Sequence, residues 1–193
     1  MRIVPINPKH PDPRYLREAV AVLRRGGLVV YPTETAYALG CDATNAKARR
    51  RLCKVKNRER AKQLPLIMSS LAAARRVVRF NAEALRLARK YWPGPLTLRL
   101  PEKGKISHTI ALRVSSHPVA RALAARLGRP IVSTSANMSG EPVKYDIVSV
   151  FHDLGFKPDF VLDAGTLLPT PPSTIVGFDQ GQPRVLRSGP IQL

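Results

Sequence analysis

The chain has 193 residues, and its 32 Lys and Arg against 13 Asp and Glu give it a formal net charge of +19 at pH 7. This length suits one compact domain, and a hydrophobic content of 44% excludes a chain too polar to bury a core. No apolar run approaches the roughly 18–20 residues that span a bilayer, and the N-terminus has no signal-peptide core. We therefore expect a soluble, cytoplasmic protein with a single domain over residues 1–193.

The positive charge is concentrated in the first half of the chain. Residues 1–105 carry 24 Lys and Arg against 7 Asp and Glu, whereas residues 106–193 carry 8 against 6. Within residues 47–62, nine of sixteen residues are basic and one is acidic, so the run repels itself unless solvent or a polyanion relieves it. The alternatives are a solvated helix face or an arginine-rich genomic bias. RNA is favoured over a membrane because the run lacks a broad apolar face with Trp or Phe.

Strand and helix signals alternate along the first half of the chain. Asp12 and Pro13 are typical of a helix start, and apolar residues then recur at helical spacing until Gly26 and Gly27 interrupt them. The elements expected here are a strand at 3–6, a helix from 13 to 25, a strand at 28–31, a polar turn at 33–35, a helix from 45 that carries the basic run, and a strand at 64–68.

The second half continues the alternation and ends in a hairpin. Ser70 and Asn81 are expected to cap two helices, and the second helix ends before the Trp92–Pro95 segment. The remaining elements are strands at 96–100 and 110–114, a helix capped near Ser116 and ended by Gly128, and strands at 131–133, 160–162, 174–178 and 184–186. This order predicts an α/β fold with a twisted mixed parallel/antiparallel sheet flanked by helices.

Several common catalytic signatures are absent from the sequence. There is no GxxxxGK[ST] phosphate loop and no GxGxxG segment after a strand. Ser135 has no GxSxG setting, which argues against a hydrolase nucleophile. Metal-ligand spacing is missing among the histidines and cysteines, which are His10, His108, His117, His152, Cys41 and Cys53. We expect ordinary surface or capping roles for the histidines and no metal ligand in the protein.

Four polar stretches remain, each at a predicted strand end or turn, where functional groups concentrate in α/β sheets. They are residues 31–40, Lys56-Asn57-Arg58 with Lys62, residues 111–114 and residues 133–140. Their hydroxyls, amide and fixed cations suit the binding of phosphates and a carboxylate. Taken singly, each stretch is more simply explained as a capped turn or a satisfied strand end.

Together and in this order, the segments resemble the YrdC/Sua5 family of threonylcarbamoyl-adenylate synthases. The resemblance is carried by 31–40, Lys56-x-Arg58, 92–97, Arg113 followed by His117-Pro118, Ser135-Ala136-Asn137, and the closing 172–176 and 185–189. It covers the chain from about residue 16 to residue 189. The implied form is a single YrdC-like domain without the C-terminal extension of the longer Sua5 members.

The resemblance implies an L-threonylcarbamoyladenylate synthase, which makes threonylcarbamoyl-AMP and pyrophosphate from L-threonine, bicarbonate and ATP. A separate machinery then transfers the threonylcarbamoyl group to an adenosine next to the anticodon of tRNA. No enzyme nucleophile is required, because a carbamate formed from threonine attacks the α-phosphate of ATP. Catalysis would then come from positioning and from neutralising phosphate charge. Mg²⁺ is expected with ATP, although no protein ligand for it can be named.

The same resemblance implies roles for individual residues. Lys56 and Arg58 would be the catalytic pair. The ATP-binding residues would be Lys56, Arg58, Lys62, Thr109, Ser135, Asn137 and Arg187. The threonine-binding residues would be Thr33 or Thr35, Arg113, the backbone of Ser133, and Ser173. Arg113 would pair with the threonine carboxylate, a task for a planar bidentate donor.

Three positions depart from the family pattern. Ala38 stands where most synthases have glycine, Glu59 replaces the usual proline after Lys-x-Arg, and Gln63 replaces a proline or glycine. The run 37–41 is similar to the YciO sister branch, whose members generally lose the Lys–Arg pair and the Ser-Ala-Asn segment that this chain keeps. The main alternative is a non-catalytic protein that binds tRNA or double-stranded RNA. A carbamoyl-transfer domain of a larger maturation enzyme is disfavoured, since no zinc-finger or acylphosphatase-like segment is present.

Overall fold

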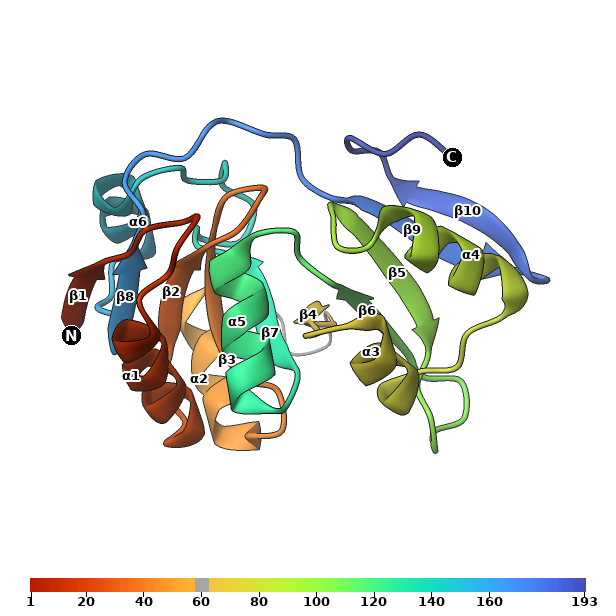
Figure 1. Cartoon of the computed structure of the whole chain (residues 1–193), viewed down its shortest axis with the longest axis horizontal. Coiled ribbons are helices and arrows are strands. Elements are labelled where there is room, and N and C mark those ends of the chain that lie inside the picture. Colours follow the sequence, from red (N-terminus) through yellow and green to blue (C-terminus); the bar gives the residue numbers. More distant parts are fainter. Residues whose placement is uncertain (58–62) are drawn as a thin grey trace.

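The computed structural model describes residues 1–57 and 63–193, so Arg58, Glu59 and Lys62 lie outside the described residues. Ten strands of this part form one mixed sheet in the order β1-β8-β2-β3-β7-β4-β6-β5-β9-β10 (Figure 1). The short strand β4 (Leu66–Ile67) pairs antiparallel with β7 and parallel with β6, and so joins a larger and a smaller half. The predicted architecture, a mixed sheet flanked by helices, is confirmed.

The larger half of the sheet is covered by helices on both faces. Its strands are β1 (Arg2–Pro5), β8 (Phe160–Asp163), β2 (Val29–Pro32), β3 (Tyr37–Asp42) and β7 (Ile131–Ser135). One face carries α1 (Pro13–Arg24) and α5 (Pro118–Leu127), and the other carries α2 (Ala46–Val55) and α6 (Ile147–Leu154). Because both faces are covered, β2 and β3 are buried along their whole length.

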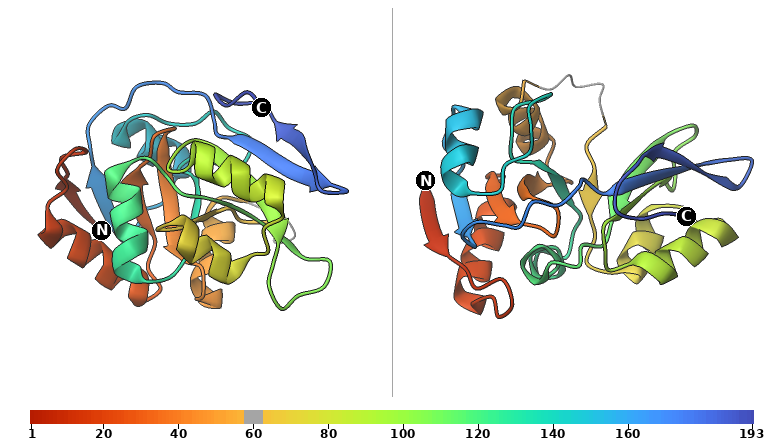
Figure 2. Two further views of the ribbon diagram at one scale, coloured as in Figure 1. Left: turned by 45° about the vertical axis from the view of Figure 1, so that its right-hand side comes forward. Right: turned by 90° about the horizontal axis from the view of Figure 1, so that it is seen from above.

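The smaller half has its own apolar cluster. Its strands are β6 (Thr109–Arg113), β5 (Leu96–Pro101), β9 (Thr174–Asp179) and β10 (Gln182–Arg187), and its helices are α3 (Leu71–Val77) and α4 (Ala82–Tyr91). Both helices pack into the same cluster of buried side chains with β5 and β6. Seen from above in Figure 2, the halves are two masses joined by β4 and by the segment between β8 and β9.

Short-range sequence signals explain most helix boundaries. The side chains of Asp12, Asn45, Ser70 and Asn81 each accept a hydrogen bond from a backbone N–H in the first turn of the helix that follows. Gly128 ends α5 with a φ of 72°, a left-handed conformation that glycine adopts without strain. In this part of the chain, no helix is both long and apolar enough to cross a membrane.

The helices are held by apolar stripes that face the sheet. In α1, Leu16, Ala19, Val20 and Leu23 lie at helical spacing, and none is more than 4% exposed. They pack with α5 in a single cluster on that face. Burial of each large aliphatic side chain contributes about 1.5–3 kcal/mol. Packing of this stripe, more than helix propensity, therefore fixes α1 against the sheet.

Three elements differ from the sequence prediction. Strand β3 was not expected, because the sequence prediction assigned no element between the polar turn at 33–35 and the helix from 45, yet β3 is wholly buried between β2 and β7. Helix α6 was also missed, although Asp146 caps it and Gly155 ends it. The cap of α5, expected near Ser116, is the adjacent His117, whose Nδ1 accepts the Val119 N–H at 3.2 Å. This confirms a capping role for one histidine.

Candidate functional site

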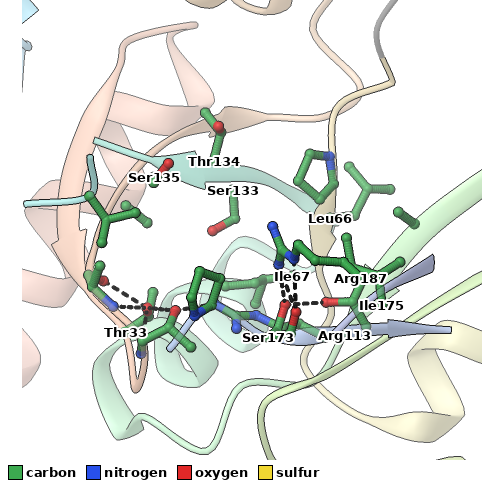
Figure 3. Close-up of a pocket in the computed structure, with 18 of the residues that line it drawn as sticks. Thr33, Leu66, Ile67, Arg113, Ser133, Thr134, Ser135, Ser173, Ile175 and Arg187 are labelled. Atoms are coloured by element: carbon green, nitrogen blue, oxygen red, sulfur yellow. Dashed lines mark hydrogen bonds between the residues drawn. The ribbon is translucent and has the colours of Figure 1, made fainter. Parts of the chain in front are cut away.

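A cavity of about 300 Å³ lies where the two halves of the sheet meet (Figure 3). The larger half contributes the turn between β2 and β3 and the residues of β7, and the smaller half contributes β6, β9, β10 and residues 170–173. Seven predicted site residues line this one cavity. They are Thr33, Thr35, Arg113, Ser133, Ser135, Ser173 and Arg187. The tertiary structure therefore brings together residues that are up to 154 positions apart.

The turn between β2 and β3 is organised by the Thr33 hydroxyl. It donates to the Ala36 carbonyl at 2.7 Å and accepts the N–H groups of Thr35 and Ala36 at 3.2 and 3.3 Å. The Thr35 hydroxyl lies 3.0 Å from the Thr33 hydroxyl and accepts from a terminal nitrogen of Arg113 at 3.3 Å. Thr33 thus forms the turn, whereas Thr35 is aimed at the arginine.

Arg113, at the end of β6, is an ion-paired side chain with little exposure. Its Nη1 lies 3.1 Å from the Glu34 carboxylate, and the two side chains are 11% and 13% exposed. The other Glu34 oxygen accepts a hydrogen bond from the hydroxyl of Ser115, which is fully buried. The Arg113 guanidinium is therefore held from behind while it lines the cavity.

Arg187 and Ser173 form a second polar group in the cavity, on β10 and at the start of β9. The Arg187 guanidinium donates to the Ser173 carbonyl at 2.7 and 3.1 Å and to the Ser173 hydroxyl at 3.1 Å. The same hydroxyl lies 2.8 Å from that of Thr97. A Cβ at Gly189 would lie 2.3 Å from the Pro172 carbonyl oxygen, so only glycine allows this close backbone approach.

The cavity is electrostatically positive. Arg113 and Arg187 both line it, and none of its described lining residues is Asp or Glu. Partial burial and the nearby Arg113 lower the pKa of Arg187 from its ordinary value, but a guanidinium stays charged at any physiological pH. Two cations and several hydroxyls around one space make a binding site for an anion, or for a ligand with two anionic groups.

Lys56 does not line the cavity. Its side chain is buried behind the end of β7, where its ammonium donates to the carbonyls of Ser135 and Asn137, the latter at 2.6 Å. Its own carbonyl accepts the Ser139 N–H at 3.1 Å. In this structure Lys56 therefore tethers the Ser135–Asn137 segment to the end of α2. Its predicted phosphate contact stays a prediction.

The other predicted ATP-binding residues are placed differently. Asn137 is buried beside Lys56, and its amide donates to the Glu141 carbonyl. Thr109 lines a second cavity of about 440 Å³, which shares Gln63 and Leu66 with the first, and its hydroxyl accepts from Arg99 Nε at 2.8 Å. Arg58 and Lys62 fall outside the described part of the chain. The Ser133 N–H donates to the Pro65 carbonyl at 2.8 Å, so it is already engaged.

Sequence reasoning missed two residues that shape the cavity. Glu34 was interpreted only as part of a polar turn, although its place between two threonines was a signal that it lies close to the site. Thr97 was quoted in the Trp92–Thr97 segment without a role, yet it lines the cavity and holds Ser173. An inward position on a strand beside a polar loop was the signal for Thr97.

Other reactive side chains are poorly suited to chemistry. Burial raises the pKa of the Cys41 thiol to about 12, so it is a packing residue and not a nucleophile. Cys53 is buried as well. Among the residues that the structure describes, no group of three or more His, Cys, Asp or Glu is arranged to hold a metal ion. The polar groups that line the first cavity are cations, hydroxyls, a side-chain amide and backbone groups.

Comparison with known proteins identifies similar chains. A family model named Sua5_yciO_yrdC, with the description "telomere recombination", matches residues 21–189. A threonylcarbamoyl-AMP synthase from Vibrio cholerae serotype O1 is 38% identical over 184 residues, which cover 90% of this chain and 97% of the Vibrio protein.

Solved structures show the same relationship. P. abyssi Sua5, crystallised in complex with L-threonine, is 30% identical and superposes with a TM-score of 0.90 over 98% of this chain. The match spans 58% of the Sua5 chain. E. coli YciO is 28% identical, with a TM-score of 0.87 over 98% of this chain and 96% of its own.

Proposed function

The chain belongs to the Sua5/YciO/YrdC family, and we propose that it is a threonylcarbamoyl-AMP synthase. As a nucleotidyltransferase, it would make threonylcarbamoyl-AMP and pyrophosphate from L-threonine, bicarbonate and ATP. The similarity to the Vibrio synthase over nearly the whole of both chains supports this assignment. The product would serve threonylcarbamoyl-adenosine modification of tRNA next to the anticodon, through a separate transfer machinery.

The observation that carries the proposal is the pair of arginines in one cavity. Arg113 and Arg187 line it together with the hydroxyls of Thr35, Ser133 and Ser173, without an acidic lining residue in the described chain. This set suits a carboxylate and a phosphate chain held side by side. Threonine and ATP are such a pair of ligands.

The two sides of the cavity suit different parts of the reaction. Arg113, with the Thr35 hydroxyl beside it, would bind the threonine carboxylate through its planar guanidinium. Arg187 and Ser135 would face the nucleotide, while Lys56 would act by holding the Ser135–Asn137 segment in place. Arg58 and Lys62 stay predicted phosphate contacts.

The reaction needs no covalent enzyme intermediate. Threonine's amine combines with carbon dioxide and releases a proton, or combines with bicarbonate and releases water, to give a carbamate. A carbamate oxygen then forms a bond to the α-phosphorus of ATP as the bond from that phosphorus to the bridging oxygen of pyrophosphate breaks. Holding these groups in line and neutralising the phosphate charge is what this cavity offers. Mg²⁺ would enter as the ATP complex and be held by phosphate oxygens.

Pyrophosphate release tests the proposal. The purified protein is incubated with MgATP and bicarbonate, with and without L-threonine, and pyrophosphate is measured by a coupled assay. We expect release that depends on threonine, with a threonylcarbamoyl-AMP product detectable by mass spectrometry. Absence of any threonine-dependent release from a folded protein would refute the proposed function.

RNA binding is a second candidate function, and the surface of α2 favours it. Lys47, Arg49, Arg50, Arg51 and Lys54 are all exposed on this ten-residue helix. In the described chain, Arg51 pairs with Asp159 at 2.5 Å, and no carboxylate pairs with the other four. Such a surface suits a phosphate backbone.

A salt titration tests RNA binding separately from catalysis. Affinity for tRNA and for double-stranded RNA would be measured between 50 and 200 mM salt, and we expect it to fall by about a factor of ten or more if several phosphates are contacted. Replacing Arg50 and Lys54 by Gln should reduce that slope without changing pyrophosphate release. Undetectable or salt-insensitive binding would remove this candidate.

A further inference from the structure

We infer that Glu34 is the positioning residue for Arg113: it orients the guanidinium toward a ligand carboxylate and makes the cavity selective against unrelated small anions. The identity of the ligand as threonine rests on the proposed function. The positioning role itself rests on the contacts of Glu34, Arg113 and Ser115.

The Arg113 guanidinium contacts both Glu34 and Thr35, which belong to the turn between β2 and β3. The Glu34 carboxylate lies 3.1 Å from Nη1 of Arg113, while Nη2 of Arg113 is 3.3 Å from the Thr35 hydroxyl. Arg113 lines the cavity, and Glu34 does not. The carboxylate is therefore placed to act on a ligand through the arginine and not by touching the ligand.

Glu34 is itself held by rigid neighbours. It lies in the turn that the Thr33 hydroxyl closes through three hydrogen bonds. Its second oxygen accepts the hydroxyl of Ser115, whose oxygen also accepts the His117 N–H at 3.1 Å, next to the start of α5. The carboxylate thus connects the β2–β3 turn to the end of β6 and to α5.

An arginine without such a partner would bind a carboxylate less well. An unpaired guanidinium samples many rotamers, and fixing it in one of them when a ligand binds costs free energy. In a pre-formed ion pair the guanidinium is already ordered, so ligand binding does not carry this cost. Arg113 and Arg187 also repel each other, and this repulsion adds to the effect of burial in lowering the pKa of Arg187. A fixed negative charge behind Arg113 offsets that repulsion and reduces the attraction of the empty cavity for any anion.

The opposing explanation is that the pair only stabilises the fold. Removal of one partner from a poorly exposed ion pair does destabilise a protein, because the other charge loses its partner. A purely structural pair, however, would not change the selectivity of the cavity between a carboxylate and an inorganic anion. That difference separates the two explanations.

The test compares Glu34→Gln and Glu34→Asp with Glu18→Gln. The first removes the charge with little change of shape, and the second keeps the charge but withdraws it by one methylene. Glu18→Gln removes the same charge from an exposed pair with Arg2, on α1 and β1. For each variant, thermal unfolding, threonine affinity by calorimetry, kinetics of pyrophosphate release, and inhibition by sulfate would be measured.

For Glu34→Gln we expect the dissociation constant and KM for threonine to rise about tenfold or more, with kcat at saturating threonine within about threefold of wild type. Sulfate should inhibit this variant several-fold more strongly. Glu34→Asp should raise the KM for threonine while sulfate inhibition stays unchanged, and Glu18→Gln should alter neither.

The inference is overturned if folded Glu34→Gln binds threonine and sulfate as wild type does, or if it loses kcat without a change of KM. If Glu34→Gln does not fold, Glu34→Asp decides: an unchanged KM for threonine overturns the inference. Should wild type bind no threonine and release no pyrophosphate, the proposed function fails instead. Calorimetric titration of sulfate into wild type and Glu34→Gln still tests the positioning role in that case.

Discussion

The two arginines of the cavity are built into the protein in different ways. Arg113 lies on a short inner strand, is 11% exposed and is paired with a carboxylate. Arg187 lies on the edge strand β10, is exposed overall, and is held by the carbonyl and hydroxyl of Ser173. In the described chain, no carboxylate pairs with it.

This difference indicates a division of labour. A buried, paired arginine has one orientation and suits a small ligand that must be placed within a fraction of an ångström. Arg187, which is more exposed and has neutral hydrogen-bond partners in the described chain, keeps its full charge for a large polyanion such as a triphosphate. We therefore expect Arg113 to govern threonine recognition and Arg187 to govern ATP affinity. The predictions below challenge this division, in order of decreasing effect.

Arg113→Ala should have the largest effect. Loss of the charged, bidentate donor is expected to lower kcat/KM for threonine by about 100-fold or more. Arg113→Lys should recover little of this, because an ammonium does not match a carboxylate in two places. Pyrophosphate release measures both variants, and calorimetric unfolding checks that each is folded. Near-normal turnover of folded Arg113→Ala would show that the carboxylate binds elsewhere.

Arg187→Ala should act mainly on the nucleotide. We expect the KM for ATP to rise about tenfold, since one charge-assisted contact is lost. Threonine affinity measured without ATP should fall by no more than about fivefold, because Thr97 still holds the Ser173 hydroxyl. Equal losses of affinity for threonine and for ATP would show that Arg113 and Arg187 act as one unit.

Thr97→Val should have a moderate effect on the side of the cavity that holds Arg187 and Ser173. The substitution removes one of the two contacts of the Ser173 hydroxyl while preserving the shape of the side chain. Loss of a neutral hydrogen bond costs about 1 kcal/mol, so the KM for threonine should rise roughly fivefold. The KM for ATP serves as the internal control and should stay constant. An unchanged KM for threonine would exclude Ser173 from the threonine pocket.

A fall in pH should lower the free energy of unfolding through His117, and we expect this effect to be the smallest. Burial lowers the pKa of His117, so the folded state binds fewer protons than the unfolded state below pH 6.5. The free energy of unfolding should therefore fall as pH drops from about 6.5 through the folded pKa, when Nδ1 is protonated and can no longer cap α5. His117→Asn, which caps without titrating, should flatten this part of the pH profile in urea unfolding. An identical profile would assign the pH dependence to other groups.

Local sequence signals predicted most of the fold because they act within a few residues. Asp12, Asn45, Ser70 and Asn81 cap their helices through bonds to N–H groups two or three residues away. The terminal hairpin was predicted from its turn residues and is present. Strand β3 was hidden because its six residues, buried on both faces, show no alternation of polar and apolar side chains.

The sequence by itself determined the helix caps, the α/β alternation, the family resemblance and seven residues that line the cavity, because each depends on local chemistry or on motifs in order. Only the tertiary structure decided what each residue touches. It paired Glu34 with Arg113 across 79 positions and placed Lys56 behind Ser135 and Asn137 instead of in the cavity. It also places Thr109 at the second cavity. Such contacts depend on how β4 joins the two halves of the sheet, and no short-range pattern records that junction.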